Sequence, residues 1–187
     1  MDLIEKDLRD ITKVFIQDSS VKARLVGVGV LSRQDAYELG CVGPTLRASG
    51  VAQDMRQLGY AAFKDLPVKP ITRPEGDSYA RCVVRCEERC QSINLIRQAV
   101  ARMPAGEIAG KVAGNPNGEF IARTEQPRGE VAYCVKANGT KNIQRFRVRT
   151  PTFANLPALV KLLQGCELAD VPVLVLTIDP CISCTER

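Results

Sequence analysis

Residues 77–103 read DSYARCVVRCEERCQSINLIRQAVARM, and they carry the strongest helical signal in the chain. The stretch is long and contains no glycine or proline, the two residues that most often interrupt a helix. Its apolar positions include Val83, Val84, Ile93, Leu95, Ile96 and Val100. Residues 104–106 (PAG) then end the pattern. The stretch therefore predicts one long helix.

Shorter helices are predicted before this stretch. Residues 2–15 have acidic residues early and apolar residues at helical spacing, namely Leu3, Ile4, Leu8, Ile11, Val14 and Phe15. Ser32 can cap a helix that runs to about Leu39 and ends at Gly40. Residues 43–50 (GPTLRASG) are rich in turn formers and cannot be regular helix throughout. Residues 61–76 predict a loop because prolines interrupt them.

The part after the long helix predicts a β-hairpin and further helix. Residues 130–135 and 144–148 are typical of two strands, and the Asn-Gly turn within residues 137–140 is a strong hairpin signal. Residues 156–163 predict a helix. Residues 171–178 are ambiguous, because their β-branched residues favour a strand whereas Asp170 and Pro172 are typical of a helix start. The expected fold is mainly α with a small β-hairpin, an α+β fold.

The composition is that of a globular protein. The 187 residues are 45% hydrophobic and 25% charged, and the formal net charge is +5. No long run of lysine and arginine exists, aromatics make up 5% and tryptophan is absent, so we expect no nucleic-acid partner. The first residues lack the apolar segment of a signal peptide, and the longest apolar run, residues 171–178, is too short for a bilayer. We therefore expect no direct membrane span.

Eight cysteines and no histidine restrict the chemistry. Without an export signal the cysteines are expected to be reduced thiols in a cytosol, serving as metal ligands, redox groups or core residues. The absence of histidine excludes histidine metal sites and Ser-His-Asp or Cys-His catalysis within this chain. A metal held by this chain must therefore be bound by thiolate or carboxylate.

Cys181 and Cys184 form a CxxC pair, close enough in sequence to chelate one metal. The preceding Asp179-Pro180 breaks regular structure and predicts a loop. Thiolates suit nickel, zinc, copper(I) and the iron of iron–sulfur clusters. The pair alone is also consistent with half of a zinc site, a redox pair or a chance spacing.

Three further cysteines, Cys82, Cys86 and Cys90, fall on one face of the predicted long helix. A straight helix separates the first from the last by about 12 Å, at 1.5 Å per residue. Metal sites need a turn that brings the ligands together, so we predict small buried core residues instead. The same prediction applies to the isolated cysteines Cys41, Cys134 and Cys166.

Residues 179–187 (DPCISCTER) resemble the second nickel-binding motif of nickel–iron hydrogenase large subunits, which reads DPCxxCxx followed by His or Arg. In that family the mature subunit ends directly after this last residue, which corresponds to Arg187. The resemblance implies that Cys181 is a terminal nickel thiolate and that Cys184 bridges nickel and iron.

Other motifs are similar to the quinone-chamber subunit of complex I, the respiratory NADH dehydrogenase. They are residues 25–30 (LVGVGV), 43–50 (GPTLRASG), 76–81 (GDSYAR), 87–88 and 91–92 (EE and QS), and 127–130 (PRGE). That complex I protein has lost the nickel cysteines, whereas this chain keeps Cys181 and Cys184. The combination resembles the C-terminal part of an energy-converting (Ech-type, group 4) nickel–iron hydrogenase large subunit, a class related to complex I.

The family's first nickel motif, RxCGxC, does not occur in this sequence. We therefore expect residues 1–187 to be a single C-terminal fragment of a large-subunit domain, without the other two thiolates. By itself such a fragment should be inactive and should not assemble a four-thiolate site. The missing N-terminal half of the large subunit is accordingly an expected partner.

Two residues match family positions beside the metals. Arg128 resembles the arginine that overhangs the nickel–iron centre, where its guanidinium would face the diatomic ligands. The alternative is a surface arginine that opens a strand. Thr152, within residues 150–153 (TPTF), resembles a hydroxyl donor to the diatomic ligands. Its alternative is ordinary capping of the following helix.

Asp77 and Arg81, at the start of the long helix, are candidate coupling residues. The resemblance implies that this region faces the quinone chamber and the proton-coupling route in the related complex I protein. A structural explanation also suffices for Asp77, because a negative charge at a helix start complements the helix dipole. Further along, residues 85–89 (RCEER) predict a salt-bridged helix face.

The resemblance implies a membrane-associated nickel–iron hydrogenase that interconverts hydrogen with protons and electrons. Its cofactors would be a nickel–iron centre with diatomic ligands, incomplete in this chain, and an iron–sulfur cluster in a partner small subunit. Membrane subunits would hold the complex on the cytoplasmic face of the cell membrane. The alternatives are a metal-free, complex I-type NADH:quinone oxidoreductase component, and a non-enzymatic structural or interaction domain with a zinc half-site or free thiols.

Overall fold

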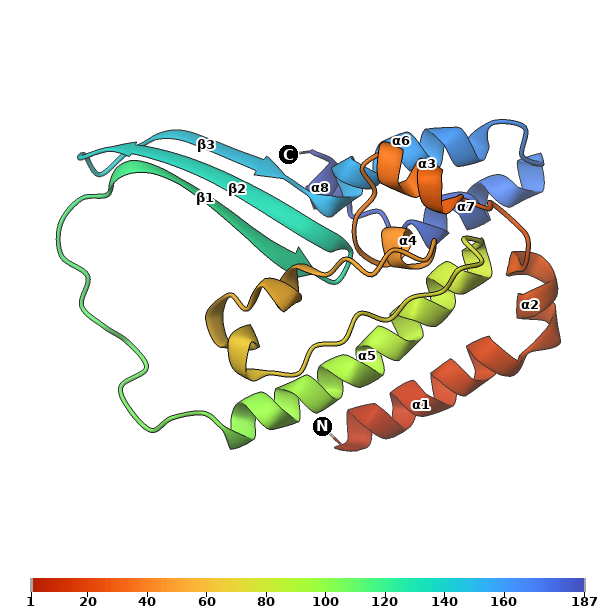
Figure 1. The fold of residues 1–187 in the computed structure, drawn as a ribbon, viewed down its shortest axis with the longest axis horizontal. Helices are drawn as coiled ribbons and strands as arrows, with labels where there is room; N and C mark the ends of the chain where they lie inside the picture. The colour runs from red at the N-terminus through yellow and green to blue at the C-terminus, as the bar shows by residue number, and fades with distance from the viewer. Residues whose placement is uncertain (1, 187) are drawn as a thin grey trace.

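The computed structural model describes residues 2–186, a helical body from which a long three-stranded sheet extends (Figure 1). Helix Asp2–Gln17 (α1) lies beside helix Ser78–Ala101 (α5), and Ser19–Leu25 (α2) connects α1 to the rest of the body. The Tyr79 hydroxyl donates to the Ile16 carbonyl oxygen at 2.9 Å. The expectation that the chain ends on a family arginine, Arg187, lies outside the described residues.

The predicted long helix is confirmed as α5. Asp77 caps its first turn, accepting a hydrogen bond of 2.7 Å from the Ala80 amide. The helix ends at Ala101, shortly before Pro104. Val84 and Ile93 are buried, so part of the apolar pattern does face the interior, as expected for a helix that packs on the body.

The segment before α5 folds into short elements. Ser32 caps helix Arg33–Glu38 (α3) by accepting from the Asp35 amide at 3.0 Å, as predicted. The segment of residues 43–50 starts with one short helix, Gly43–Arg47 (α4), and then leaves regular structure. Two 3₁₀ segments follow, Met55–Leu58 (η1) and Ala61–Asp65 (η2). The loop predicted for residues 61–76 therefore begins only after η2, and it runs from there to α5.

The sheet has three antiparallel strands in the order β1-β2-β3 (Figure 1). The predicted hairpin is confirmed as Gly129–Asn138 (β2) and Ile143–Arg149 (β3). The sequence predicted only this two-stranded hairpin, but the sheet has a third strand. Asn117–Gln126 (β1) pairs along the whole of β2. This strand is mostly polar and largely exposed, so it lacks the alternation that marks a half-buried strand. Its pairing with β2, rather than its own pattern, defines it.

Three helical elements follow the sheet. Helix Pro151–Leu163 (α6) starts earlier than predicted, with Thr150 as its cap. A 3₁₀ turn, Leu168–Asp170 (η3), leads into helix Val171–Thr177 (α7). The ambiguous segment is therefore a helix, as the proline near its start indicated. Leu174 of α7 is fully buried, in a part of the body that lies away from the sheet.

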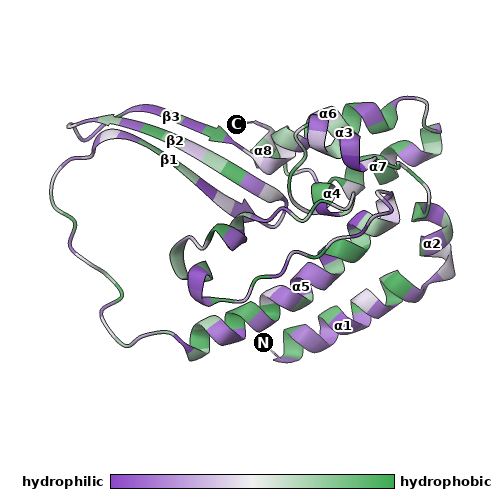
Figure 2. Ribbon diagram, viewed as in Figure 1, coloured by the Kyte–Doolittle hydropathy of each residue, from purple (hydrophilic) through white to green (hydrophobic). Residues whose placement is uncertain are grey.

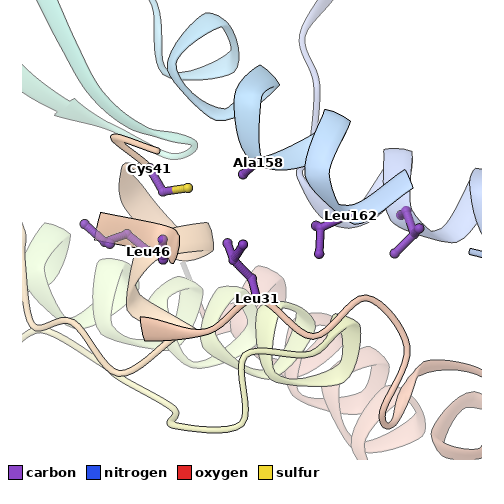
Figure 3. Packing of buried hydrophobic residues seen from close by; sticks show 7 residues of the cluster. Leu31, Cys41, Leu46, Ala158 and Leu162 are labelled. Carbon is purple, nitrogen blue, oxygen red and sulfur yellow. The ribbon is translucent and has the colours of Figure 1, made fainter. Parts of the chain in front are cut away.

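The main core joins the loop before α3 to α4, α6 and α7 (Figure 3). Its buried members are Leu31, Ala36, Cys41, Leu46, Ala158, Leu162 and Leu174. Shortening one fully buried leucine in such a cluster to alanine typically costs about 2–5 kcal/mol. The core therefore fixes α4, α6 and α7, the elements around the cysteine-bearing loop, relative to one another.

Apolar and polar residues alternate along α1 and α5 (Figure 2). Within residues 2–186, no helix combines the length and the apolar character needed to cross a bilayer. Helix α1 nevertheless leaves several large apolar side chains exposed, namely Leu3, Ile4, Ile11, Val14 and Phe15. One face of α1 is thus uncovered in this chain.

Candidate metal centre

A sharp turn places the two cysteines beyond α7. Asp179 adopts a left-handed backbone with φ of 58°, a conformation that aspartate tolerates better than most residues. Pro180 follows, and Cys181 starts the short helix Ile182–Thr185 (α8). The Cys184 amide donates to the Cys181 carbonyl oxygen at 3.0 Å, which closes one turn around the CxxC pair. The predicted loop is confirmed, and we call residues 178–186 the cysteine loop.

The two thiols influence each other's protonation. The Ser183 hydroxyl lies 3.1 Å from Cys181 Sγ. This contact, together with hydrogen bonds from the Cys184 amide and thiol, lowers the pKa of Cys181 to about 7. Burial and the neighbouring Cys181 raise the pKa of Cys184. At pH 7 about half of the molecules therefore carry a Cys181 thiolate, and a soft metal cation displaces the remaining protons of the pair when it binds.

The start of α6 supports the cysteine loop from one side. Thr152, which is 1% exposed, accepts a hydrogen bond of 3.2 Å from the Cys181 amide through Oγ1. Its hydroxyl also lowers the pKa of Cys184 by hydrogen bonding to that thiol. The Thr150 hydroxyl donates to the Cys184 carbonyl oxygen at 2.5 Å. Thr150 is thus the helix cap, whereas Thr152 lies directly behind the thiols.

The turn between β1 and β2 supports the cysteine loop from the other side. Arg128 occupies this turn, and its Nε donates to the Asp179 carbonyl oxygen at 2.8 Å. Its Nη2 lies 3.4 Å from the Asp179 carboxylate. The charge of Arg128 favours the thiolate form of both cysteines. Arg128, Thr152 and the two thiols, which the sequence singled out separately, therefore come together in one site.

Two glycines allow the β1–β2 turn to lie in backbone contact with the start of α4. A Cβ atom added to Gly43 would lie 2.4 Å from the Arg128 carbonyl oxygen, and one added to Gly129 would lie 2.7 Å from the Gly43 amide nitrogen. Both glycines also have positive φ. Asn155 of α6 holds the adjacent Val42, with its Oδ1 accepting from the Val42 amide at 3.0 Å. Backbone contact thus sets the position of Arg128.

Asp77 and Arg81 contact the body around the start of α5 instead of the thiols. Asp77 accepts from the Gly27 amide at 2.8 Å in addition to capping α5. Arg81 is fully buried and donates to the Gly76 and Gly29 carbonyl oxygens at 2.8 and 3.0 Å. It also donates to Thr177 Oγ1 at 3.3 Å, which joins α5 to the end of α7. Burial lowers the pKa of Arg81 to about 10.

The predicted salt-bridged face at residues 85–89 is wrong. Glu88 pairs with Arg47 of α4, whose Nε lies 2.6 Å from its carboxylate, and Glu87 pairs with Arg73. Arg85 approaches the cysteine loop, with Nε 3.9 Å from the Asp179 carboxylate. The tertiary structure turns these side chains toward other elements, so pairing along the helix is replaced by longer-range contacts.

The structure contains a buried ionic cluster around Arg47 that the sequence did not predict. Arg47 is 1% exposed, and its Nη1 donates to Glu125 of β1 at 2.9 Å and lies 3.7 Å from Asp54. Burial opposes its charge, but the carboxylates of Glu88 and Glu125 raise the pKa of Arg47 overall. The only sequence signal was a single arginine between Leu46 and Ala48 in a segment with no other charge. The cluster ties α4, α5 and β1 together beside the β1–β2 turn.

The remaining cysteines are only partly core residues. Cys41 and Cys86 are buried as predicted, and burial raises the pKa of Cys41 to about 11. The others, Cys82, Cys90, Cys134 and Cys166, are half-buried. In the part of the chain that the structure describes, no three or more cysteine and acidic side chains converge in a metal-binding arrangement. The CxxC pair therefore stands as a two-thiol donor set.

Residues 1–114 and 110–187 match the family model described as "Respiratory-chain NADH dehydrogenase, 49 Kd subunit". The chain belongs to this family. It is 43% identical to the carbon monoxide-induced hydrogenase of Rhodospirillum rubrum over 100% of this chain and 53% of that protein. Identity to the membrane-bound hydrogenase subunit alpha of Pyrococcus furiosus is 40%, over 96% of this chain and 46% of the relative.

Other members of the 49 kDa family have different names. An NADH-quinone oxidoreductase subunit of Solibacter usitatus is 37% identical over 95% of this chain and 52% of that protein. In three dimensions the chain matches a chain of the membrane-bound sulfane sulfur reductase, an archaeal respiratory membrane complex. That match has a TM-score of 0.92 and 30% identity, over 100% of this chain and 53% of the other. The resemblance found in the sequence is confirmed, and this 49 kDa family chain spans about half the length of the relatives it matches.

Proposed function

We propose that this 49 kDa family chain supplies half of the thiolate ligands of a nickel–iron centre in an energy-converting hydrogenase. The observation that carries the proposal is the CxxC pair, in which both thiols share one turn and Cys181 has a pKa of about 7. Two soft sulfur donors fit nickel, and the nearby positive charge of Arg128 favours their thiolate forms. Two relatives are named hydrogenases, which supports the proposed activity.

In this proposal Cys181 and Cys184 would hold the nickel–iron centre, with Cys181 as a nickel thiolate and Cys184 as its second thiolate ligand. When bound, a nickel–iron centre with diatomic ligands supplies Lewis acidity for the heterolytic cleavage of hydrogen. Cys181 Sγ would be one base for the proton, because a metal-bound thiolate keeps lone pairs that accept a proton. Thr152 holds the Cys181 amide in place, and Arg128 fixes the loop through Asp179 while keeping positive charge beside the thiols.

The complete enzyme requires further polypeptides in this proposal. The two missing thiolates come from a segment that corresponds to the other half of the relatives' length. An iron–sulfur cluster in a small subunit would accept the electrons, and membrane subunits would hold the complex at the cytoplasmic face of the membrane. Support comes from the relatives, one of which is named a membrane-bound hydrogenase subunit and one of which belongs to a respiratory membrane complex.

The test is nickel analysis of the assembled complex together with hydrogen-evolution activity. Cys181→Ser and Cys184→Ser should each lower bound nickel at least about tenfold, because loss of a direct ligand exceeds the effect of disturbing its surroundings. Cys134→Ser, the same change at a half-buried thiol on the sheet, is the matched control and should leave nickel unchanged. A complex that contains no nickel would overturn the proposal.

The second candidate is a metal-free NADH:quinone oxidoreductase component, favoured by the similarity to the Solibacter usitatus protein. In that case the complex contains no nickel, and quinone reduction persists in Cys181→Ser. The non-enzymatic alternative, a structural or interaction domain, predicts zinc or free thiols at the pair and no loss of activity in either serine variant. The metal content and the two activities therefore separate all three functions.

A further inference from the structure

Arg85 of α5 has an incompletely satisfied guanidinium. Its side chain is 13% exposed, and Nη1 donates to the Arg81 carbonyl oxygen at 3.1 Å. The other two nitrogens, Nε and Nη2, are buried and have no hydrogen-bond partner among residues 2–186. Buried polar groups are nearly always paired, and an unpaired buried charge is strongly destabilising. These two atoms therefore indicate a partner that the described residues do not provide.

The acidic groups near Arg85 are already engaged elsewhere. Asp179 lies 3.9 Å from Nε, too far for a hydrogen bond, and it faces Arg128 on its other side. Glu88 is bound to Arg47 at 2.6 Å. A further charge nearby, Arg89, is positive. Burial lowers the pKa of Arg85, and the attraction of Asp179 does not compensate for this.

The free edge of Arg85 has a specific shape. Nε and one Nη nitrogen of a guanidinium lie side by side and can donate two parallel hydrogen bonds to the two oxygens of one carboxylate. A single carbonyl oxygen satisfies only one of them. The unpaired Nε and Nη2 therefore match an aspartate or glutamate side chain better than a main-chain group.

Two cavities meet at Arg85. The larger, of about 520 Å³, extends along α1 and α5 and includes Ile4, Leu8 and Ile96. The smaller, of about 230 Å³, includes Ile11, Phe15 and Leu176. Arg85, Arg89 and Asp179 line both. Several apolar side chains around these cavities are exposed, among them Leu176 at 73% and Ile4 at 54%.

A polypeptide is the occupant that these features fit. Arg47 and Arg56 also line the larger cavity, but both already have carboxylate partners. Apolar side chains flank the unpaired edge of Arg85 on both sides, which suits an amphipathic helix with one acidic residue among apolar ones. The ligands of one metal must meet at one point. The segment that brings the missing thiolates to Cys181 therefore passes close to Asp179 and the cavities next to it.

We propose that Arg85 binds a carboxylate of the polypeptide that completes the thiolate site, on a helix that covers α1 and the cysteine loop. The inference rests on the proposed function in one respect, namely that a further segment supplies thiolates. It adds the chemistry of that contact, a bidentate ion pair surrounded by apolar side chains.

The test uses the assembled complex and its thermal unfolding. Arg85→Met keeps the length and apolar character of the side chain but leaves the carboxylate unpaired. The unfolding temperature should fall by about 5 °C or more, as for loss of one member of a buried ion pair. Arg145→Met, the same change at an exposed arginine of β3 that lines neither cavity, is the control and should change the unfolding temperature little. An unchanged or higher temperature in Arg85→Met overturns the inference.

A second comparison separates the proposed carboxylate from Asp179. Asp179→Asn is combined with Arg85→Met in a double-mutant cycle. The proposal expects Arg85→Met to lower the unfolding temperature as much in the Asp179→Asn complex as in the parent complex. A much smaller decrease in the Asp179→Asn complex would identify Asp179 as the partner and overturn the inference. If Arg85→Met does not assemble, Arg85→Lys, which keeps the charge, should restore assembly in part, and failure to do so overturns it. The nickel content is measured on the same complexes. A complex without nickel overturns the proposed function, whereas the role of Arg85 is decided by the unfolding temperatures.

Discussion

Arg128 and Asp179, 51 residues apart in the sequence, are joined by a hydrogen bond of 2.8 Å from Nε to the main-chain oxygen. The bond links the tip of the β1–β2 turn to the residue whose left-handed backbone turns the chain toward Cys181. Thr152 contacts the Cys181 amide from α6. Two independent elements therefore hold the cysteine loop, and each can be tested separately.

Replacing Arg128 with lysine should impair catalysis more than metal binding. Lysine keeps a positive charge but cannot reproduce the guanidinium's paired contacts with the Asp179 main chain and side chain. In the assembled complex we expect kcat for the proposed hydrogen evolution to fall at least about tenfold through misplacement of the loop, with nickel retained. Arg147→Lys, at an exposed position on β3, is the matched control. Equal kcat in both variants would show that Arg128 has no positioning role.

Gly43→Ala should destabilise the protein strongly. The added methyl group would meet the Arg128 carbonyl oxygen at 2.4 Å in a residue with φ of 66°, so backbone atoms must move. We expect a loss of about 2–4 kcal/mol in the free energy of unfolding, combining strain and steric overlap. Gly27→Ala, with φ of 72° and open space around it, isolates the conformational part and should cost only about 1 kcal/mol. Denaturant unfolding of both variants measures the difference.

Asp54 should contribute to stability in an acid-sensitive way. Burial opposes its charge, but hydrogen bonds from Arg56 and the charge of Arg47 hold the pKa of Asp54 below its usual range. The unfolded chain therefore binds the proton more tightly, and the contribution of Asp54 is present above its unfolded pKa of about 3.9 and lost as the pH falls through the folded value.

The measurement is the free energy of unfolding of Asp54→Asn and of the parent between about pH 6 and pH 3, the range that brackets the unfolded pKa. The parent should lose more stability than the variant at the acid end, so the two curves converge as the pH falls. Asp65→Asn, the same change at an exposed aspartate, should leave the parent's pH dependence intact. Parallel curves for Asp54→Asn would contradict the assigned role.

Cys181 should be the most reactive thiol of the metal-free chain. With a pKa of about 7 it is largely thiolate at pH 8, whereas Cys41, with a pKa of about 11, stays protonated and buried. Iodoacetamide followed by peptide mass spectrometry should label Cys181 first, with a rate that rises through pH 7. Ser183→Ala removes the largest contribution to the lowered pKa and should move that rise to higher pH. Labelling that starts at another cysteine would disprove the arrangement.

Local signals identified much of the fold in advance. Capping by Ser32, the uninterrupted pattern of α5 and the Asn-Gly turn between β2 and β3 act within a few residues, so they can be predicted from sequence. The cysteine pair and its neighbouring motifs also indicated the family. β1 escaped prediction because its strand character comes from pairing with β2 and not from its own pattern.

The sequence by itself determined the long helix α5, the hairpin of β2 and β3, the CxxC spacing of Cys181 and Cys184, and the membership of the 49 kDa family. Only the tertiary structure decided which side chains meet: Arg128 with Asp179, and Arg47 with Glu88 and Glu125, across 41 to 78 residues. The physical reason is that an ion pair between distant segments depends on how α4, α5 and the sheet pack. No periodic pattern records that packing, and the edge of Arg85 that residues 2–186 leave unpaired could be recognised only once its surroundings were known.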